Sequence, residues 1–508
     1  MRRGWPSIAV ALGLPLLAAA SALAAPDDLD EPPVPAPSHP VPPPAPAPAP
    51  AAPPASAPAA KPAAHPAAAP VPAPAPAAPT ATPAPPAAVE PGGPVPWPTV
   101  GPGGAPGPTV IAAPGAPPTG ASPPQLDAFA RRTKVGAYGE AQLFVDGESN
   151  ATARLPLAAI SVEHRPTDWV RIAVAAQIED GNKAGMQQAL VEAQPLRALG
   201  FRAGLMILPI GLGNLAPEPT SFLTVDRPLT DQLIVPSVWR ELGVGLSGEV
   251  VPGLRYQGAV VSGLDGSGFS AAAPFWGGRG DGSSLAIHDA AIVGRVELCD
   301  VPPGLVVGGG GYVGGASHGI AALSGLRAGI VEADLRYHNH GFDIAAEYAR
   351  LYVVNSYLVN GYLGLLGQSA VPARGRGFYL QVGYDLLRLA AGDGQQELVL
   401  FAGYENVDAR SAMSPFNYNP PTITGPGQLP PEAPSPALGY LRGGIDYRPL
   451  PSVVLKLDLQ VALDGQGPQP GAPSVMAGAP GTPRPIGTDV ADAARGATRV
   501  GLALAFNF

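Results

Sequence analysis

Cysteine, aromatic residues and charged residues are all scarce in this sequence of 508 residues. It has one cysteine, 6% aromatic residues and 14% charged residues. The single thiol, Cys299, cannot form an intramolecular disulfide, so no disulfide framework supports the fold. The net charge of −9 lacks the basic excess that is typical of general nucleic-acid binders, and we therefore expect no nucleic-acid partner.

Long apolar runs are also scarce, and the first of them lies at the N-terminus. Residues 1–24 combine Arg2 and Arg3 with an apolar run over residues 8–17, and they end in the mostly small residues 22–24, as at a signal-peptide cleavage site. This pattern predicts a secretory signal peptide. A membrane anchor is the alternative, but the apolar run is short and contains Pro15. No later stretch could form a transmembrane helix, so a membrane-spanning form of this chain would have to be a closed β-barrel.

Residues 25–124 consist mainly of alanine and proline, in repeats such as residues 44–50 and 71–77. Proline removes backbone donors and alanine alone cannot build a core, so this segment is predicted to be a disordered, extended tether. One interpretation is a periplasmic spacer that reaches or binds the cell wall. The other is a neutral linker.

From Lys134 onward, apolar residues alternate with small or polar ones over about ten residues at a time, and Gly, Pro, Asp and Asn separate the segments. About sixteen strands are predicted, an even number as in bacterial single-chain barrels. Residues 125–508 are therefore expected to form an all-β, transmembrane antiparallel β-barrel. The predicted strands begin near Lys134, Leu155, Trp169, Met186, Phe201, Glu241, Leu254, Leu285, Leu305, Arg327, Phe342, Arg376, Glu397, Gly439, Val453 and Arg499.

The connections between these strands alternate in length. Those after even-numbered strands are short, for example residues 166–168, 251–253 and 450–452. Those after odd-numbered strands are mostly long, for example residues 264–284 and 408–438. Short periplasmic turns and long outer loops are typical of outer-membrane barrels.

The last predicted strand, residues 499–508, supports the same interpretation. Its alternate residues Val500, Leu502, Leu504, Phe506 and Phe508 are apolar and fall on one face, which is predicted to face lipid. A terminal phenylalanine on such a strand resembles the recognition signal for the barrel-assembly machinery, which is therefore a predicted partner through Phe508.

The same alternation predicts which side chains face the lumen. In the third strand Val170, Ile172, Val174, Ala176 and Ile178 would face lipid, which places Arg171, Gln177 and Glu179 inside. A lumen with charges of both signs is typical of a water-filled pore. The other predicted inward residues are Arg202, Arg255, Glu332, Asp334, Arg336, Arg442, Asp446, Arg448, Lys456, Asp458 and Gln460.

One connection, residues 208–240, is about thirty residues long and is expected to be functional for that reason. Five stretches in and around it, residues 208–211, 218–219, 226–228, 236–245 and 261–269, resemble outer-membrane porins of the phosphate-selective porin O/P type. In such porins one long loop folds into the barrel and sets its narrowest cross-section. The resemblance implies the same for residues 208–240, together with a homotrimer and a preference for anions such as phosphate.

An anion channel would need positive charge where the anion loses water. Near the predicted constriction these charges are Arg202, Arg227 and Arg240, with Arg171 and Arg255 on nearby strands. Glu241 adjoins Arg240 and is predicted to be part of the same site. Acidic residues at 218, 226 and 231 lie in the same stretch, so each arginine has two interpretations. It either touches the permeating solute or pairs with a carboxylate to brace the loop.

Three patterns that resemble enzyme or metal sites are weak. Residues 243–248 spell a dinucleotide fingerprint, but the turn at residues 251–253 leaves no room for the required helix. Residues 315–319 spell a nucleophile elbow that also lacks a following helix. His338 and His340 are two histidines without a third ligand. We therefore predict no catalytic residue, cofactor or metal.

The sequence as a whole predicts an outer-membrane porin for passive diffusion of small hydrophilic solutes or ions, with its N-terminal tether in the periplasm. Two other classes remain open. One is a structural outer-membrane anchor, tethered to the cell wall by the Ala/Pro-rich segment. The other is an outer-membrane hydrolase, for which Ser317 and His318 are the only neighbouring serine and histidine found.

Overall fold

The computed structural model describes residues 129–146, 151–181, 183–271, 273–280, 282, 289–391, 394–414, 437–463 and 498–508. The predicted signal peptide and tether lie outside the described residues and stay predictions. None of the helices in the described part of the chain has the length and apolar content needed to span a bilayer.

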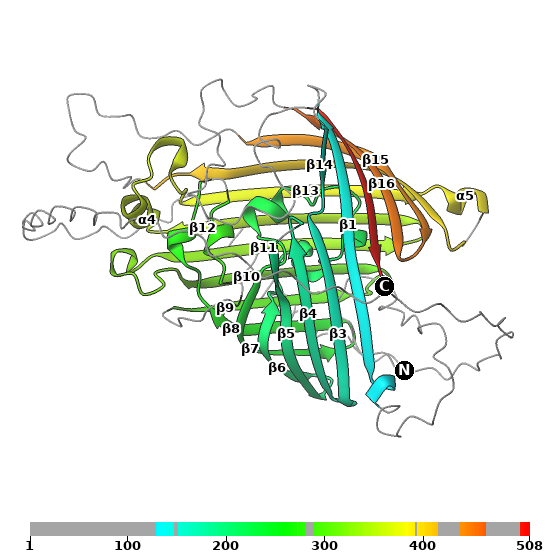
Figure 1. Ribbon diagram of the computed structural model, residues 1–508, viewed down its shortest axis with the longest axis horizontal. Helices are drawn as coiled ribbons and strands as arrows, with labels where there is room; N and C mark the ends of the chain where they lie inside the picture. The colour runs from blue at the N-terminus through cyan, green and yellow to red at the C-terminus, as the bar shows by residue number, and fades with distance from the viewer. Residues whose placement is uncertain are drawn as a thin grey trace, which may run out of the picture. The chain divides into compact units, whose positions relative to one another are not determined.

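The strands form one antiparallel sheet that closes on itself. From β3 to β17 each strand pairs with the next in the chain, and β1 pairs with β17, from Tyr138 opposite Asn507 to Asp146 opposite Arg499 (Figure 1). The strands are β1 Thr133–Asp146, β2 Ala151–Arg154, β3 Leu157–Thr167, β4 Val170–Glu179, β5 Lys183–Leu196, β6 Leu199–Ile207, β7 Arg240–Val251, β8 Leu254–Ser262, β9 Ala290–Cys299, β10 Leu305–Gly315, β11 Arg327–Asn339, β12 Phe342–Val354, β13 Arg374–Asp385, β14 Glu397–Ala412, β15 Leu438–Leu450, β16 Val453–Ala462 and β17 Arg499–Asn507.

The wall of the barrel has sixteen strand positions, because β2 and β3 lie end to end against the same strand. Both pair with β1, β2 through residues 151–154 and β3 through residues 158–164. Pro156 lies in the gap between them and cannot donate a ladder hydrogen bond. The predicted sixteen-stranded antiparallel barrel is confirmed. The predicted second strand, near Leu155, is split at this break, and the start predicted near Leu285 lies outside the described residues.

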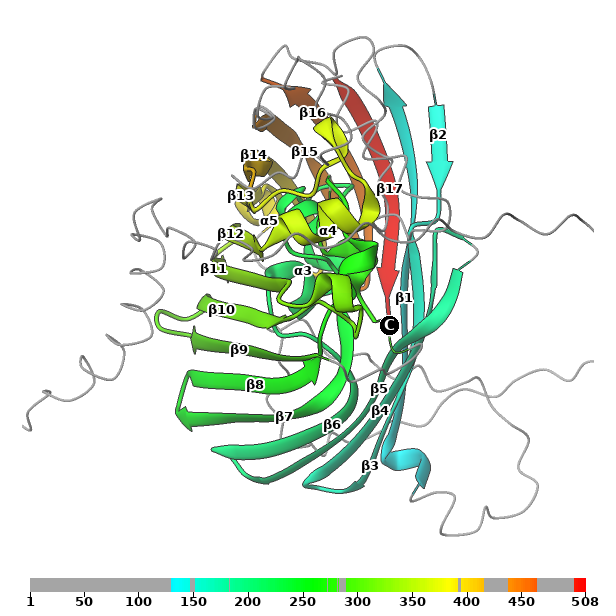
Figure 2. The same cartoon turned by 90° about the vertical axis from the view of Figure 1, so that its left-hand side faces the viewer.

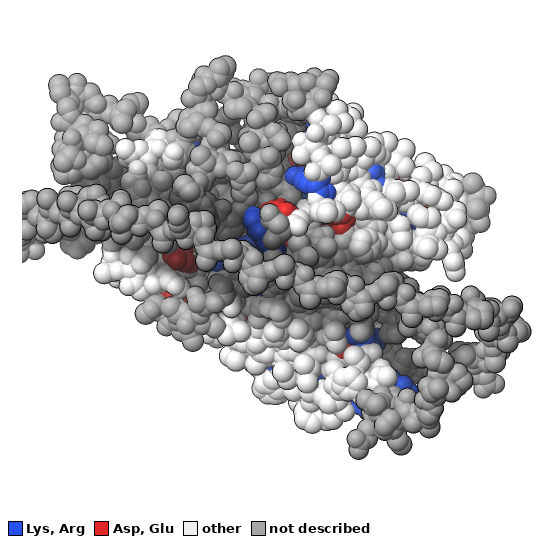
Figure 3. Space-filling model, viewed as in Figure 1, with Lys and Arg blue, Asp and Glu red and all other residues white. Residues whose placement is uncertain are grey.

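Alternation along the strands decides which side chains face outward. On β4, Val174 is 43% exposed whereas Gln177 is 3% exposed. On β17 the five predicted lipid-facing residues are all exposed, from Val500 to Phe508. The described strands in Figure 3 accordingly present a largely uncharged surface. The apolar outer face is confirmed.

The two ends of the barrel differ in their connections. Turns of two to five residues join β3 to β4, β5 to β6, β7 to β8, β9 to β10, β11 to β12 and β15 to β16. At the opposite end, β6 joins β7 through residues 208–239, which we call the lumen loop. This loop contains α3 Leu212–Leu215, the one-turn helix η1 Pro219–Ser221 and the π-helical turn η2 Thr230–Ile234.

The lumen loop folds into the barrel, as predicted. The loop joins two adjacent strands, β6 and β7, but it contacts distant ones. Its η2 turn contacts β12, β13 and β14, and its η1 turn contacts β17 and β1. A loop can reach strands that distant only through the interior. Figure 2 shows α3 between the wall that contains β11 and β12 and the wall that contains β1 and β17.

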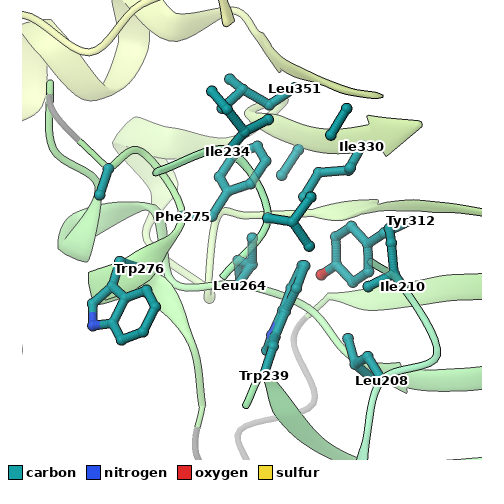
Figure 4. Close-up of a cluster of buried hydrophobic side chains, with 14 of the residues drawn as sticks. Leu208, Ile210, Ile234, Trp239, Leu264, Phe275, Trp276, Tyr312, Ile330 and Leu351 are labelled. Carbon is teal, nitrogen blue, oxygen red and sulfur yellow. The ribbon is translucent and has the colours of Figure 1, made fainter. Parts of the chain in front are cut away.

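A second connection also folds inward, which the sequence did not indicate. Residues 264–284 were predicted to form an ordinary outer loop, but Leu264, Phe275 and Trp276 are buried and belong to one apolar cluster with Trp239 of the lumen loop (Figure 4). The connection contains the 3₁₀ turns η3 Gly266–Gly268 and η4 Trp276–Gly278.

Apolar side chains of the wall complete this cluster. Tyr312 on β10 lies 4.6 Å from Trp239 between ring centroids, and Ile330 and Leu351 point into the same cluster from β11 and β12. One part of the barrel interior is therefore packed like the core of a soluble protein, whereas the sequence predicted a water-filled lumen lined by charges of both signs.

The remaining helices lie in the longer connections. They are η5 Ala321–Leu323, α4 Ser356–Leu363, η6 Gly367–Ser369 and α5 Leu387–Ala391. Of these, α4 contacts η3 and η5, so three separate connections pack against one another at the same end of the barrel.

Candidate functional site

The lumen loop is held against the wall by buried polar side chains, and one lysine makes three of these contacts. Lys456 of β16 donates to the main-chain oxygens of Pro219, Phe222 and Thr224, at 2.7, 2.6 and 3.0 Å. Its ammonium group also lies 3.9 Å from the centre of the Phe222 ring. Because an ammonium has three donors, this geometry satisfies Lys456 completely with loop atoms.

A cluster of three arginines surrounds Asp226 of the loop. Arg499 of β17 contacts one carboxylate oxygen at 2.6 Å and Arg154 of β2 contacts the other, while Arg442 of β15 donates to the main-chain oxygen at 3.2 Å. Burial alone would raise the pKa of Asp226, but the guanidinium groups of Arg154, Arg499 and Arg442 bring it below its usual value. Asp226 is therefore ionised and fixed.

The third contact of the loop with the wall is between carboxyl groups. Glu347 of β12 accepts the Leu212 main-chain N–H at 2.8 Å, and the Tyr379 hydroxyl lies 3.3 Å from Asp231 and 3.5 Å from Glu347. Burial raises the pKa of Asp231 to about 6. The protonation of Asp231 therefore changes near pH 6, and this contact of the loop depends on pH.

The end of the loop is fixed by the motif Trp239–Arg240–Glu241. Glu241 is buried and accepts hydrogen bonds from the Trp239 indole at 3.1 Å, the Ser262 hydroxyl at 2.6 Å and the Gly280 N–H at 3.0 Å. Arg240 pairs with Glu179 at 3.1 Å. Glu241 therefore ties the two inward-folded connections together.

The residue before this motif has a strained backbone. Val238 has a φ of 53°, a left-handed conformation that is rare for a β-branched residue, and it is completely buried. Such strain persists where surrounding packing over-determines the backbone.

The predicted arginines on the wall form a row of ion pairs. Arg171 pairs with Glu163 at 2.7 Å and also with Glu192, and Arg202 pairs with Glu192 at 3.1 Å and donates to Gln257 at 2.9 Å. The structure thus brings Arg171 and Arg202 together around one carboxylate.

The other predicted arginines lie apart from that carboxylate. Arg255 stands opposite Glu249 and Glu297 in the ladders of β7 and β9. Arg227 donates to main-chain oxygens of Gly213 and Pro217 within the loop. Arg171, Arg202 and Arg240 thus pair with carboxylates of the wall, whereas Arg227 contacts main-chain oxygens of the loop.

A further ion-pair cluster continues the row on β9 to β11. Arg295 is buried and contacts Glu297 at 2.7 Å, Glu332 at 2.8 Å and Asp334 at 2.5 Å. Acidic and basic groups therefore alternate around this side of the lumen, and no basic ladder stands out on it. The charges are arranged to neutralise one another.

Space inside the barrel is limited where the loop meets the wall. A cavity of about 30 Å³, enough for about one water molecule, is lined by residues that include Arg227, Asp231, Arg336 and Tyr379. The partly exposed residues of the loop are concentrated between Pro217 and Phe222, and those on the wall include Glu163, Arg171 and Glu192.

Sequence reasoning missed the residues that dock the loop. Lys456, Arg442 and Asp458 were predicted to face inward, and they do, but Arg154, Glu347 and Arg499 received no role. The contacts join positions more than seventy residues apart, up to 273 for Arg499 and Asp226. The alternation along a strand shows whether a side chain lies on the lipid face or the lumen face, but it does not show which residue the side chain contacts across the lumen.

The enzyme-like patterns have structural explanations. The residues 243–248 lie within β7. Asp289 accepts the Ser317 hydroxyl at 2.8 Å and the main-chain N–H groups of Ser317 and His318 at 2.6 and 2.9 Å, so it caps a turn. His338 lies 3.6 Å from Asp343 at the end of β11. Within the described ranges no group of three or more His, Cys, Asp or Glu residues is placed to hold a metal ion.

Comparison with known proteins gives distant likenesses. No family model matches the chain. An uncharacterised protein of Aquifex aeolicus is 28% identical over 296 residues, which cover 56% of this chain and 63% of that protein, so this chain spans less than two thirds of its relative's length.

Three solved structures with a partly similar backbone fold have about 10% sequence identity to this chain. Salmonella typhi OmpF has 10% identity and a TM-score of 0.45, over 74% of this chain and 97% of the other. Pseudomonas putida OprB has 11% identity and a TM-score of 0.43, over 75% and 95%. An anion-selective porin from Comamonas acidovorans has 10% identity and a TM-score of 0.41, over 74% and 100%.

Proposed function

We propose that this protein is a porin of the bacterial outer membrane, through which small hydrophilic solutes and ions diffuse passively. The observation that carries the proposal is the closed barrel itself, with an apolar outer face, charged side chains on its inner face and a loop docked inside. Only a closed barrel or a helix satisfies every backbone group within a bilayer.

The outer face of the barrel supports a membrane location. Soluble proteins rarely expose large contiguous apolar areas, whereas here exposed Val, Leu and Ile side chains recur on strand after strand. Exposed aromatic side chains lie at the end with the short turns, as in the girdle at a membrane interface. These aromatic residues are Trp169, Phe201, Phe342, Phe506 and Phe508.

The solute path runs past the lumen loop. Its selectivity would be set by size and by the lumen charges, of which Arg171, Arg202, Arg227, Arg240, Glu241 and Arg255 are the predicted set. The resemblance of residues 208–269 to the porin O/P type favours anions such as phosphate. Most of these arginines are already paired with carboxylates or carbonyl groups, which argues against a strong preference for anions.

The partners follow from the same proposal. Outer-membrane lipid would cover the apolar face, the barrel-assembly machinery would recognise Phe508, and three copies would form a homotrimer. Residues 25–124 would extend through the periplasm as a tether that binds the cell wall.

A second candidate function is a structural outer-membrane anchor with a closed barrel. The observation that favours it is the extent to which the lumen loop and residues 264–280 fill the interior, with Trp239, Leu264 and Phe275 buried in one cluster. In that case the tether, rather than the lumen, would be the functional part.

The reversal potential of the purified protein in a planar bilayer under a salt gradient tests both functions. A stable conductance supports the porin, and an anionic reversal potential supports the anion preference. A cationic potential would refute that preference while keeping the channel. A correctly folded barrel without conductance would refute the porin in favour of the anchor.

A further inference from the structure

Of the three arginines around Asp226, Arg442 also pairs with Glu405 of β14 at 3.2 Å, so Arg154 and Arg499 are the two whose ion pair depends on Asp226. Arg154 and Arg499 each contact one oxygen of the Asp226 carboxylate, and within the described residues their other side-chain hydrogen bonds are with neutral amides. Arg154 donates to Gln142 at 2.8 Å, and Arg499 donates to Gln460 at 3.1 Å. Without Asp226, both guanidinium groups would lack a bonded anion in a mostly buried place.

The two arginines are also held in position independently of Asp226. Both guanidinium groups lie over the same Phe144 ring, with their central carbons 4.4 Å from its centroid for Arg154 and 4.6 Å for Arg499. Gln142 is in turn oriented by hydrogen bonds to Glu140 at 3.0 Å and to the main-chain oxygen of Val225 at 2.8 Å. Preorganised donors lower the entropic cost of binding a ligand.

The cluster lies where a solute could meet it. Arg154 ends β2 and Arg499 begins β17, so both stand at the end of the barrel with the long connections. The Arg154 side chain keeps 19% of its surface exposed. Asp226 itself belongs to the loop, whose main-chain atoms are fixed by Lys456, Arg442 and Asp458, so its side chain can leave the cluster without undocking the loop.

We infer that Arg154 and Arg499 form a binding site for the carboxylate group of a solute, which Asp226 occupies as an internal ligand. A solute carboxylate would take the place of the Asp226 carboxylate, one guanidinium on each oxygen. The inference rests on the proposed channel function and names a solute class for it. Carboxylate is the class chosen because the two oxygens of Asp226 already show the fit, one to each arginine.

The Asp226 carboxylate competes with a solute carboxylate for Arg154 and Arg499 and so lowers the affinity of the site for the solute. Asp226 is tethered next to the arginines, so a free solute must compete with a high local concentration of the internal carboxylate. Replacing Asp226 with asparagine keeps the size of the side chain and removes its charge. We expect Asp226→Asn to strengthen carboxylate binding by about ten- to hundredfold, the range for one charge-assisted hydrogen bond.

The test measures the block of chloride current by succinate, with the purified full-length protein in planar bilayers at constant ionic strength. Asp226→Asn should lower the half-blocking succinate concentration, and the double variant Asp226→Asn with Arg499→Gln should raise it again. Glu397→Gln is the matched control, because it removes one acidic charge at the opposite end of the strands, where Glu397 pairs with Arg448 at 3.4 Å. Migration of heated and unheated samples in gels verifies that each variant is folded.

The outcomes separate this inference from the proposed function. A response of Asp226→Asn no larger than that of Glu397→Gln would overturn the site. Block of Asp226→Asn by phosphate as strong as that by succinate would overturn the assignment to carboxylates. Succinate binding is also measured by calorimetry in detergent. Binding that Asp226→Asn strengthens, in variants that all lack conductance, would refute the channel but support the site.

Discussion

Lys456 is the residue whose replacement should most directly release the lumen loop. Its ammonium group donates to three loop carbonyls between Pro219 and Thr224 and is almost completely buried. Lys456→Met keeps much of the side-chain length and removes the charge and all three donors. We expect the released loop to give larger or more frequent open events in single-channel recordings.

The magnitude follows from the contacts. A hydrogen bond to a charged group contributes about 1.5–3 kcal/mol, and the three bonds share one ammonium, so their sum is not additive. A loss of about 2–3 kcal/mol is a roughly 30- to 140-fold change in the ratio of docked to undocked loop. The other contacts of the loop, at Asp226 and Glu347, stay in place and limit the displacement to residues 219–224.

The control for this prediction is Lys183→Met. Lys183 also pairs with a carboxylate, Asp180 at 2.8 Å, but both side chains are exposed near an outer turn. Exposed pairs contribute about 0–1 kcal/mol, so this variant should behave like the wild type. Identical open-event statistics for Lys456→Met, Lys183→Met and the wild type would refute the idea that Lys456 holds the loop.

Three further predictions concern the core, the pH dependence and the membrane face. Trp239→Ala should destabilise the barrel by about 3–5 kcal/mol in denaturant unfolding, whereas Val244→Ala on the exposed face should change stability by less than about 1 kcal/mol; equal effects would contradict an interior core. Because burial raises the pKa of Asp231 to about 6, its stabilising contribution is fully present below about pH 4 and is lost as pH rises through 6. Unfolding at several pH values should show this loss and Asp231→Asn should lack it, so an unchanged profile in the variant counts against the assignment. Val174→Arg should weaken insertion into vesicles by about 2–4 kcal/mol if β4 faces lipid, and unimpaired insertion would argue against the membrane location.

Much of the fold could be predicted because the side chains of a barrel strand alternate between the lipid face and the lumen face, and this alternation is visible in the local sequence. The alternation of Val174 and Gln177 gives the outer and inner faces of β4 directly, and turn residues separate one strand from the next. Closure was predicted because no stretch after the N-terminus could form a transmembrane helix, so a membrane-spanning form had to be a closed barrel. The pattern did not predict the break at Pro156, which divides one strand position of the wall into β2 and β3.

The sequence by itself therefore determined the barrel, its two faces and the long connection at residues 208–240. Only the tertiary structure decided how that connection docks, since Lys456 contacts Pro219 and Arg499 contacts Asp226 across separations of more than two hundred residues. The tertiary structure also decided that Leu264 and Phe275 turn inward to pack with Trp239. The physical reason is that alternation is a local constraint of the pleated strand, whereas partners across a lumen depend on how the sheet closes.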